Sequence, residues 1–331
     1  MRVTALLLLL CFSFGIHSAF SVDLSDVQTV ARSIGPAYSS YLKGLLSDRY
    51  GDTQRALKEY IKAGKLDSDS DSLKLRIAVQ YIKLNDFDKA VELLDKITDE
   101  EPINLDAYLL LILLYSERGQ DKESNQMYEE MLSKLYKQKP DNLRIAESLA
   151  QFKFHKGDYQ SALKIYENIL KIDPSYTDAY FWIGYLHEEA GERSYAMDYW
   201  KKTLELDPNH SDALNSLGYV YAEEGTHLDE AEALVKHALE IKPDSPAYLD
   251  SLGWVYFKKK EFLKAKEYIE KASNLLKDPV ILDHLGDVYY ALGNFSKAEE
   301  LWQEVLAIEP ENKTIQEKVD NLKDELKAAK D

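Results

Sequence analysis

Hydrophobic residues recur along most of the chain at the spacing of a helix face. In segment 248–259, four residues occupy positions i, i+3, i+4 and i+7, which share one side of a helix: Leu249, Leu252, Gly253 and Tyr256. Trp254 points roughly 100–180° away from that side, as does Phe257. The pattern predicts a helix. Trp254 and Phe257 do not belong to the apolar face by which this helix would pack.

A small residue followed four positions later by a bulky one recurs eight times, at intervals close to 34 residues. The pairs are Ala56/Tyr60, Ala90/Leu94, Ser124/Tyr128, Ala162/Tyr166, Ala196/Trp200, Ala231/Val235, Ala265/Ile269 and Ala298/Trp302. Upstream of several pairs lies a bulky-x-x-Leu-Gly-x-x-Tyr motif, as at Leu282, Leu285, Gly286 and Tyr289. Repetition at this period predicts a stack of two-helix units.

Each motif position has a physical reason, counted from the start of its unit. We expect Gly at the eighth position to let the first helix approach the second, and Tyr at the eleventh to fill the remaining space. The small residue at the twentieth should admit a neighbouring helix, and the bulky residue at the twenty-fourth should pack into the next unit. Proline near the thirty-second cannot continue a helix and ends the second one. These prolines are Pro102, Pro174, Pro208, Pro243 and Pro310.

The motifs resemble those of the tetratricopeptide repeat (TPR) family over nearly the whole chain after residue 36. This resemblance implies an all-α fold, a right-handed α-solenoid of about eight helix-turn-helix units. The units span 37–70, 71–104, 105–142, 143–176, 177–210, 211–245, 246–278 and 279–312. The first is degenerate, with Lys43 in place of Leu and Ser68 in place of Pro. The third has four extra residues near "LYKQKP", which predict a longer second helix.

Amphipathic segments at 22–36 and 313–331 are expected to cap the two ends of the stack. The first has an apolar stripe formed by Leu24, Val27, Val30, Ala31 and Ile34. The second has a narrow stripe formed by Ile315, Val319, Leu322 and Leu326. A seam for a coiled-coil partner is the alternative for the second stripe, which is shorter than two heptads.

Residues 1–21 have the pattern of a secretory signal peptide. Arg2 is their only charge, an apolar stretch follows, and Ala19-Phe20-Ser21 fits a cleavage site. Cys11 is the only cysteine, and the leucines before it do not form a lipoprotein motif, although lipidation there remains an alternative. A mature chain without cysteine suits the bacterial periplasm. We therefore expect a periplasmic or secreted protein, which could associate with the outer membrane, with no transmembrane segment after cleavage.

The chain is strongly acidic, with 58 Asp and Glu against 41 Lys and Arg. This balance argues against nucleic acid and anionic lipid surfaces as partners. The sequence contains no Gly-rich phosphate loop and no H-E-x-x-H, C-x-x-C or G-x-S-x-G motif, so an enzyme is not indicated. His187 takes a packing position of the repeat, and Asp283 and His284 diverge by about 100° on a helix. No catalytic residue, cofactor or metal is indicated.

In the TPR family the first helices line a groove, and positions 2, 5, 9, 12 and 13 usually contact the ligand. Transferred residue by residue, the resemblance implies an aromatic strip bordered by carboxylates. The residues of the strip are Phe181, Tyr185, Tyr219, Trp254, Phe257 and Tyr290. The residues of its border are Asp212, Asp250, Asp283 and Asp287. Aromatic residues often dominate binding at interfaces, and the acidic border favours a basic or amide-rich protein or peptide. Alternatively, these aromatic residues only pack against the first helix of the next repeat and bind no partner. The apolar first helices of the second and third repeats favour such packing, or a second hydrophobic contact with a partner. Their apolar residues are Leu75, Val79, Ile82, Leu109 and Leu113.

We therefore expect a non-enzymatic interaction scaffold or adaptor of the bacterial cell envelope, which binds a partner in its groove. The stretch from Leu214 to Asn294 also resembles outer-membrane-associated TPR adaptors of a periplasmic processing protease. The alternative is an envelope factor for polysaccharide export or assembly, because aromatic strips also stack on sugar rings.

Overall fold

The computed structural model describes residues 35–328, and every regular element within this range is an α-helix. The helices form two compact units, which we call the N-terminal unit (to Gln138) and the C-terminal unit (from Lys139). The all-α fold predicted from the sequence is confirmed. The proposed signal peptide and most of the proposed N-terminal cap lie outside the described residues.

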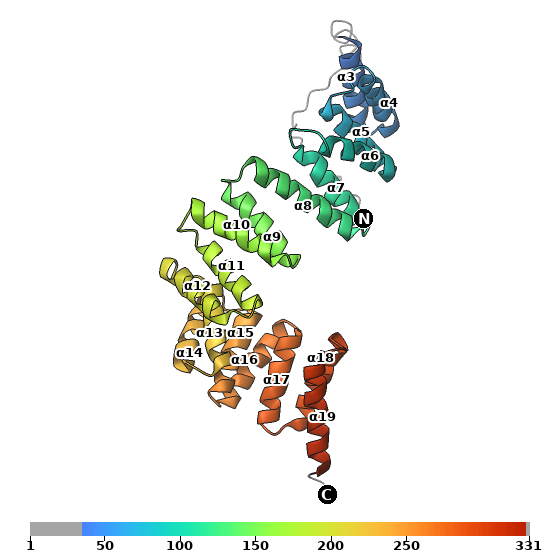
Figure 1. The fold of residues 1–331 in the computed structure, drawn as a ribbon. Coiled ribbons are helices and arrows are strands. Elements are labelled where there is room, and N and C mark those ends of the chain that lie inside the picture. Colours follow the sequence, from blue (N-terminus) through green and yellow to red (C-terminus); the bar gives the residue numbers. More distant parts are fainter. Residues whose placement is uncertain (1–34, 329–331) are drawn as a thin grey trace. The chain divides into compact units, whose positions relative to one another are not determined.

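The N-terminal unit contains six described helices, which follow one another in pairs (Figure 1). They are α3 (Pro36–Arg49), α4 (Thr53–Gly64), α5 (Asp71–Lys83), α6 (Phe87–Thr98), α7 (Leu105–Glu117) and α8 (Asp121–Gln138). With 18 residues, α8 is longer than the others, which confirms the prediction from the insertion in the third repeat.

The C-terminal unit contains eleven described helices (Figure 1). They are α9 (Leu143–His155), α10 (Tyr159–Ile172), α11 (Thr177–Glu189), α12 (Arg193–Leu206), α13 (Ser211–Glu224), α14 (Leu228–Ile241), α15 (Pro246–Lys258), α16 (Phe262–Leu275), α17 (Pro279–Ala291), α18 (Phe295–Ile308) and α19 (Lys313–Ala328). In each repeat the first helix packs against the second as a hairpin, as α15 does against α16.

In five of the eight repeats, close packing inside the hairpin depends on glycine at the eighth position. A Cβ atom at Gly286 would lie 2.4 Å from Nε1 of Trp302, and one at Gly253 would lie 2.3 Å from Cγ1 of Ile269. Both distances are too short for any side chain. The bulky residue at the twenty-fourth position therefore packs over the glycine of its own hairpin, a contact that we had not expected from the sequence.

The turn inside a hairpin contains a residue in the left-handed region, and at the starts of α4, α10 and α18 a capping side chain follows it. Gly157 has φ of 79°, which glycine adopts without steric cost. The carboxylate of the next residue, Asp158, accepts a hydrogen bond from the backbone N–H of Ser161 at 3.3 Å. It thereby satisfies one of the free donors at the start of α10.

The core of the C-terminal unit continues into its last helix. Ile315, Val319 and Leu322 of α19 are almost completely buried and join one cluster with Trp302 and Val305 of α18. The apolar stripe of α19 thus lies against the end of the stack and leaves its charged side in solvent. Among the described residues, no helix combines the length and the apolar character needed to cross a membrane.

Candidate partner-binding surface

The ten predicted groove residues lie on four first helices of the C-terminal unit. We call the side of α11, α13, α15 and α17 that carries them the first-helix surface. Helix α15 contacts both α13 and α17, so side chains one repeat apart in the sequence become neighbours in space. The surface is therefore built from residues separated by about 34 positions.

Trp254 is held on three sides and is only 7% exposed. Its ring stacks on Phe257, with centroids 4.7 Å apart and planes 4° from parallel, and on His284 at 4.0 Å and 13°. The indole N–H donates a hydrogen bond to Glu223 of α13. The Nζ atom of Lys258 lies 4.9 Å from the ring centroid, a cation–π distance. Trp254 therefore joins α13, α15 and α17.

His284, whose ring stacks on Trp254, forms a buried pair with Asp250. Nδ1 of His284 lies 2.9 Å from Oδ2 of Asp250, and the two residues are only 6% and 5% exposed. Burial by itself lowers the pKa of His284. The hydrogen bond to Asp250 and the charges of Asp283 and Asp287 outweigh burial and raise it above its ordinary value. The imidazole is thus favoured in its protonated form, which donates to Asp250.

The other predicted border carboxylates also have partners within the C-terminal unit. Asp212 accepts a hydrogen bond from the hydroxyl of Tyr248 and lies 3.2 Å from Nζ of Lys242. Asp283 and Asp287 both lie 2.6 Å from Nζ of Lys318 of α19. Burial, together with the charge of Asp283, raises the pKa of Asp287. The border is therefore largely neutralised from within the chain.

Contacts between rings gather the predicted aromatic residues into groups. Phe181 is 8% exposed, lies 6.4 Å from the half-buried Tyr185 and packs against the ring of His210 at 4.9 Å. Tyr219 lies 6.4 Å from His284 and so joins the group around Trp254. Burial, with the nearby Glu223 and Asp250, raises the pKa of Tyr219.

Tyr290 is the most exposed of the predicted aromatic residues, at 36%. Its ring lies 5.4 Å from that of Phe295 and 5.9 Å from that of Trp302, and its hydroxyl donates to Glu325 of α19 at 2.8 Å. Phe257 is half-buried where it stacks on Trp254. The structure thus offers Tyr219, Phe257 and Tyr290 as partly accessible aromatic groups beside a fixed Trp254.

Four residues that contact the predicted groove residues were missed in the sequence: His284, Glu223, Lys258 and Lys318. Their partners belong to adjacent repeats, as the separations of 34 for Asp250–His284 and 35 for Asp283–Lys318 show. A comparison of charged positions one repeat apart would have found both pairs.

The apolar residues predicted on the first helices of the N-terminal unit divide into two sets. Leu75 and Ile82 of α5 are 8% and 5% exposed, and Val79 between them is half-buried. Leu109 and Leu113 of α7 are 49% and 37% exposed. The α5 residues pack into the core, whereas α7 presents an apolar surface of the kind found at contact faces.

No group of three or more His, Cys, Asp or Glu side chains that could hold a metal ion occurs within residues 35–328. His187 stacks on Tyr199, with ring centroids 5.3 Å apart, and its Nδ1 lies 2.7 Å from Glu192. These contacts are those of a packed, hydrogen-bonded histidine.

Five family models match the chain, and each is described as a tetratricopeptide repeat. They match residues 49–102, 148–194, 199–233, 247–275 and 279–312. Together they span more than half of the sequence. The chain belongs to the tetratricopeptide repeat family. A TPR fold is typical of non-catalytic scaffolds that bind other proteins. No curated protein matches the chain in sequence.

Solved structures share the TPR fold at low sequence identity. A chain of the Cut9–Hcn1 heterotetramer of the APC/C is 18% identical, with a TM-score of 0.57 over 82% of this chain and 52% of that one. A TPR protein from Parabacteroides merdae is 19% identical, with a TM-score of 0.54 over 76% and 98%. PilW, a type IV pilus biogenesis factor, is 22% identical, with a TM-score of 0.50 over 63% and 95%. These likenesses concern the fold alone.

Proposed function

We propose that this TPR protein is an interaction scaffold that holds a segment of a partner protein on the first-helix surface, beside Trp254. One observation carries the proposal. Trp254 is fixed by stacking, a hydrogen bond and a cation–π contact, while Phe257 next to it is only half-buried. A rigid aromatic surface binds at a lower entropic cost than a mobile one.

The internal ion pairs bear on the chemistry of the partner. A cationic side chain that approached Asp283 or Asp287 would compete with Lys318, and one that approached Asp212 would compete with Lys242. We therefore favour an amide-rich segment with apolar anchors over a strongly basic one. Aromatic edges and hydrogen bonds would supply most of its affinity.

We also propose that the protein acts in the bacterial cell envelope, on the basis of the apolar, Arg2-led segment 1–21. Signal cleavage after Ser21 predicts a mature chain whose mass lacks residues 1–21, in an envelope fraction. Lipidation would add mass at Cys11, and Cys11→Ser serves as the control. Recovery of the unprocessed chain from the cytoplasm would contradict this location.

The binding surface is tested by quantitative pull-down from envelope extract. We compare the wild type, the pair Phe257→Ala/Tyr290→Ala, and the matched pair Leu263→Ala/Tyr195→Ala, whose residues are 75% and 61% exposed on second helices. A protein retained by the wild type and the matched control, but lost with Phe257→Ala/Tyr290→Ala, supports the proposal. Equal capture by all three refutes it, and glycan-array binding without captured protein would favour the polysaccharide alternative.

A further inference from the structure

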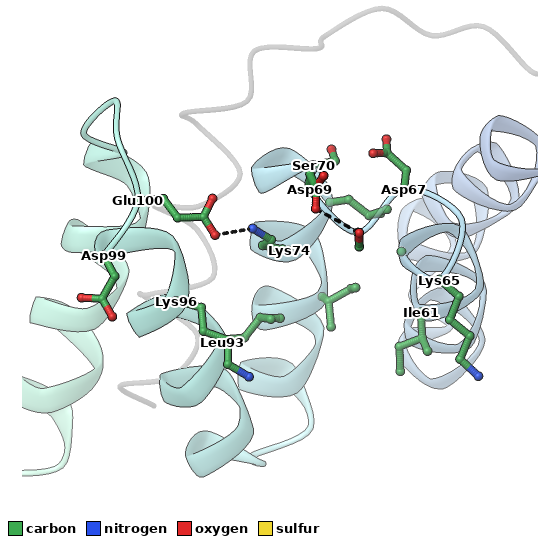
Figure 2. A pocket seen from close by; sticks show the side chains of 14 residues that line it. Ile61, Lys65, Asp67, Asp69, Ser70, Lys74, Leu93, Lys96, Asp99 and Glu100 are labelled. Atoms are coloured by element: carbon green, nitrogen blue, oxygen red, sulfur yellow. Dashed lines mark hydrogen bonds and ion pairs between the residues drawn. The ribbon is translucent and has the colours of Figure 1, made fainter.

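The N-terminal unit contains a hollow of about 680 Å³ away from the residues predicted as a site (Figure 2). It lies between the end of α4, the turn 65–70, the start of α5 and the end of α6. Figure 2 shows Ile61 of α4 and Lys65, which follows α4, on one side and Leu93 and Lys96 of α6 on the other. Its size falls within the ~300–1,000 Å³ usual for ligand pockets.

The hollow lies beside a position that has no side chain in this repeat and carries leucine in most others. Gly64 lies eight residues after the small residue of its repeat, Ala56. The same position in five other repeats carries Leu132, Leu170, Leu204, Leu239 and Leu306. Leu204, for example, packs against the buried cluster of Leu214, Ala238 and Tyr248. In the first repeat the corresponding space stays open.

Neither backbone conformation nor close packing requires glycine at this position. A Cβ atom at Gly64 would lie 3.5 Å from Cδ1 of Ile77 and 3.8 Å from Cδ2 of Leu73, which are ordinary contacts. At Gly44, by contrast, it would lie 2.6 Å from the ring of Tyr60. Gly64 ends α4 in a helical conformation that any residue can adopt. The fold would tolerate a side chain here, so packing does not account for the hollow.

The lining of the hollow combines apolar side chains with unneutralised carboxylates. Ile61, Leu73, Ile77 and Leu93 supply the apolar part. Two of the three lysines at the rim are already paired, Lys74 with Glu100 at 2.8 Å and Lys96 with Glu92 at 2.8 Å. Asp67, Asp69 and Asp99 have no ion pair within the described residues, and Lys65 is the remaining cation. The rim therefore has a surplus of negative charge.

The turn that bears these carboxylates also differs from its counterparts. In the fourth and fifth repeats the equivalent residues, Asp173 and Asp207, accept hydrogen bonds from the backbone N–H groups of Ser175 and Asn209 at 2.9 and 3.0 Å. The carboxylate of Asp67 makes no such bond within the described residues. It is free to meet a charge from outside.

We propose that this hollow is a second interaction site, which binds a protein segment with a bulky aliphatic or aromatic side chain next to Lys or Arg. The apolar anchor fills the place that leucine occupies in other repeats. The adjacent cation pairs with Asp67 or Asp69. This site is independent of the first-helix surface, so either proposal can fail without the other.

The test is selection of random linear peptides on the full-length chain, followed by affinity measurements. We expect enriched peptides to carry the apolar–basic pair, and Gly64→Leu to weaken their binding by roughly tenfold or more, because the leucine occupies the space of the anchor. Gly64→Ala should weaken it less. Absence of enriched peptides, enrichment of acidic ones, or equal binding to Gly64→Leu overturns the proposal.

A second variant keeps the proposal testable if Gly64→Leu fails to fold. Asp67→Asn/Asp69→Asn changes only exposed side chains and should weaken binding of the same peptides several-fold. The matched pair Asp106→Asn/Asp121→Asn, which makes the same change of charge at exposed positions of α7 and α8, should leave their binding unchanged. Equal effects of the two pairs would show that only the net charge matters and would overturn the site.

Discussion

The turn between α4 and α5 and the turn between α12 and α13 occupy the same place in the repeat but are built differently. The second has Leu204, Asp207 and Pro208, where the first has Gly64, Asp67 and Ser68. Leu204 packs against buried residues, and Asp207 bonds to the backbone of its own turn. In the α4–α5 turn the corresponding space is open and the corresponding carboxylate is free.

This difference distinguishes the positions of a repeat that are required for helix packing from the positions that can vary and contact a partner. The glycine at the eighth position and the bulky residue packed over it recur because the two helices must approach closely. The end of the second helix is less constrained, since α4 folds with glycine at a position where α12 carries leucine. Variation at such positions can create a binding site without loss of the fold.

Replacement of Trp254 by alanine should have the largest effect, because this residue joins three helices. We expect the free energy of unfolding of the C-terminal unit to fall by about 3–5 kcal/mol, the usual cost of removing a large buried aromatic side chain. Denaturant unfolding of the full chain measures it. Leu263→Ala, at a position that is 75% exposed, is the control and should cost less than about 1 kcal/mol. Similar losses for the two would mean that Trp254 is not enclosed as described.

Leu204→Gly tests the comparison of the two turns directly, because it converts the filled turn into an open one. We expect a loss of about 3 kcal/mol, from the missing contacts of leucine and from glycine in a helix. The same denaturant titration measures it, and hydrogen exchange should show increased opening at α12 and α13. If stability is unchanged, the leucine at this position does not help to hold the stack together.

The Asp250–His284 pair predicts a pH dependence of stability in the C-terminal unit. The pKa of His284 is raised in the folded state. Its contribution is therefore fully present below the unfolded value of ~6.5 and is lost as the pH rises through the folded value. The free energy of unfolding should decrease as the pH rises through this window, by less than the loss expected for Leu204→Gly. His284→Gln should remove this contribution to the dependence of stability on pH. Asp250→Asn should reduce the same contribution. If the free energy of unfolding depends on pH in both variants as it does in the wild type, the pairing of Asp250 with His284 is contradicted.

The smallest expected effect is a gain. Gly64→Ala should stabilise the N-terminal unit by about 0.4–1 kcal/mol, because alanine restricts the unfolded chain and fits the helical backbone. Gly44→Ala is the matched control and should destabilise, since its Cβ atom would overlap the ring of Tyr60. A loss of stability for Gly64→Ala in thermal unfolding would show that the hollow is required by packing.

Sequence reasoning recovered the helices and the repeat because both depend on local periodicity. The small residue at Ala298, the glycine at Gly286 and the bulky Trp302 could be assigned from spacing alone. The sequence showed that Trp254 lies outside the packing motif of its own repeat, but it could not show that His284 and Glu223 enclose it, because those contacts cross between repeats. The hollow beside Gly64 was missed for a related reason. It lies beside a position without a side chain, which no hydrophobic pattern records.

The central claim, that the first-helix surface binds a protein partner, is tested most directly by site-specific photo-cross-linking in cells. A photoreactive phenylalanine analogue is placed at the half-buried Phe257, which stacks on Trp254, or at Leu263, which is 75% exposed in the same repeat. We predict that one protein is captured from position 257 and not from position 263. Absence of an adduct at 257, or the same adducts at both positions, would contradict the account.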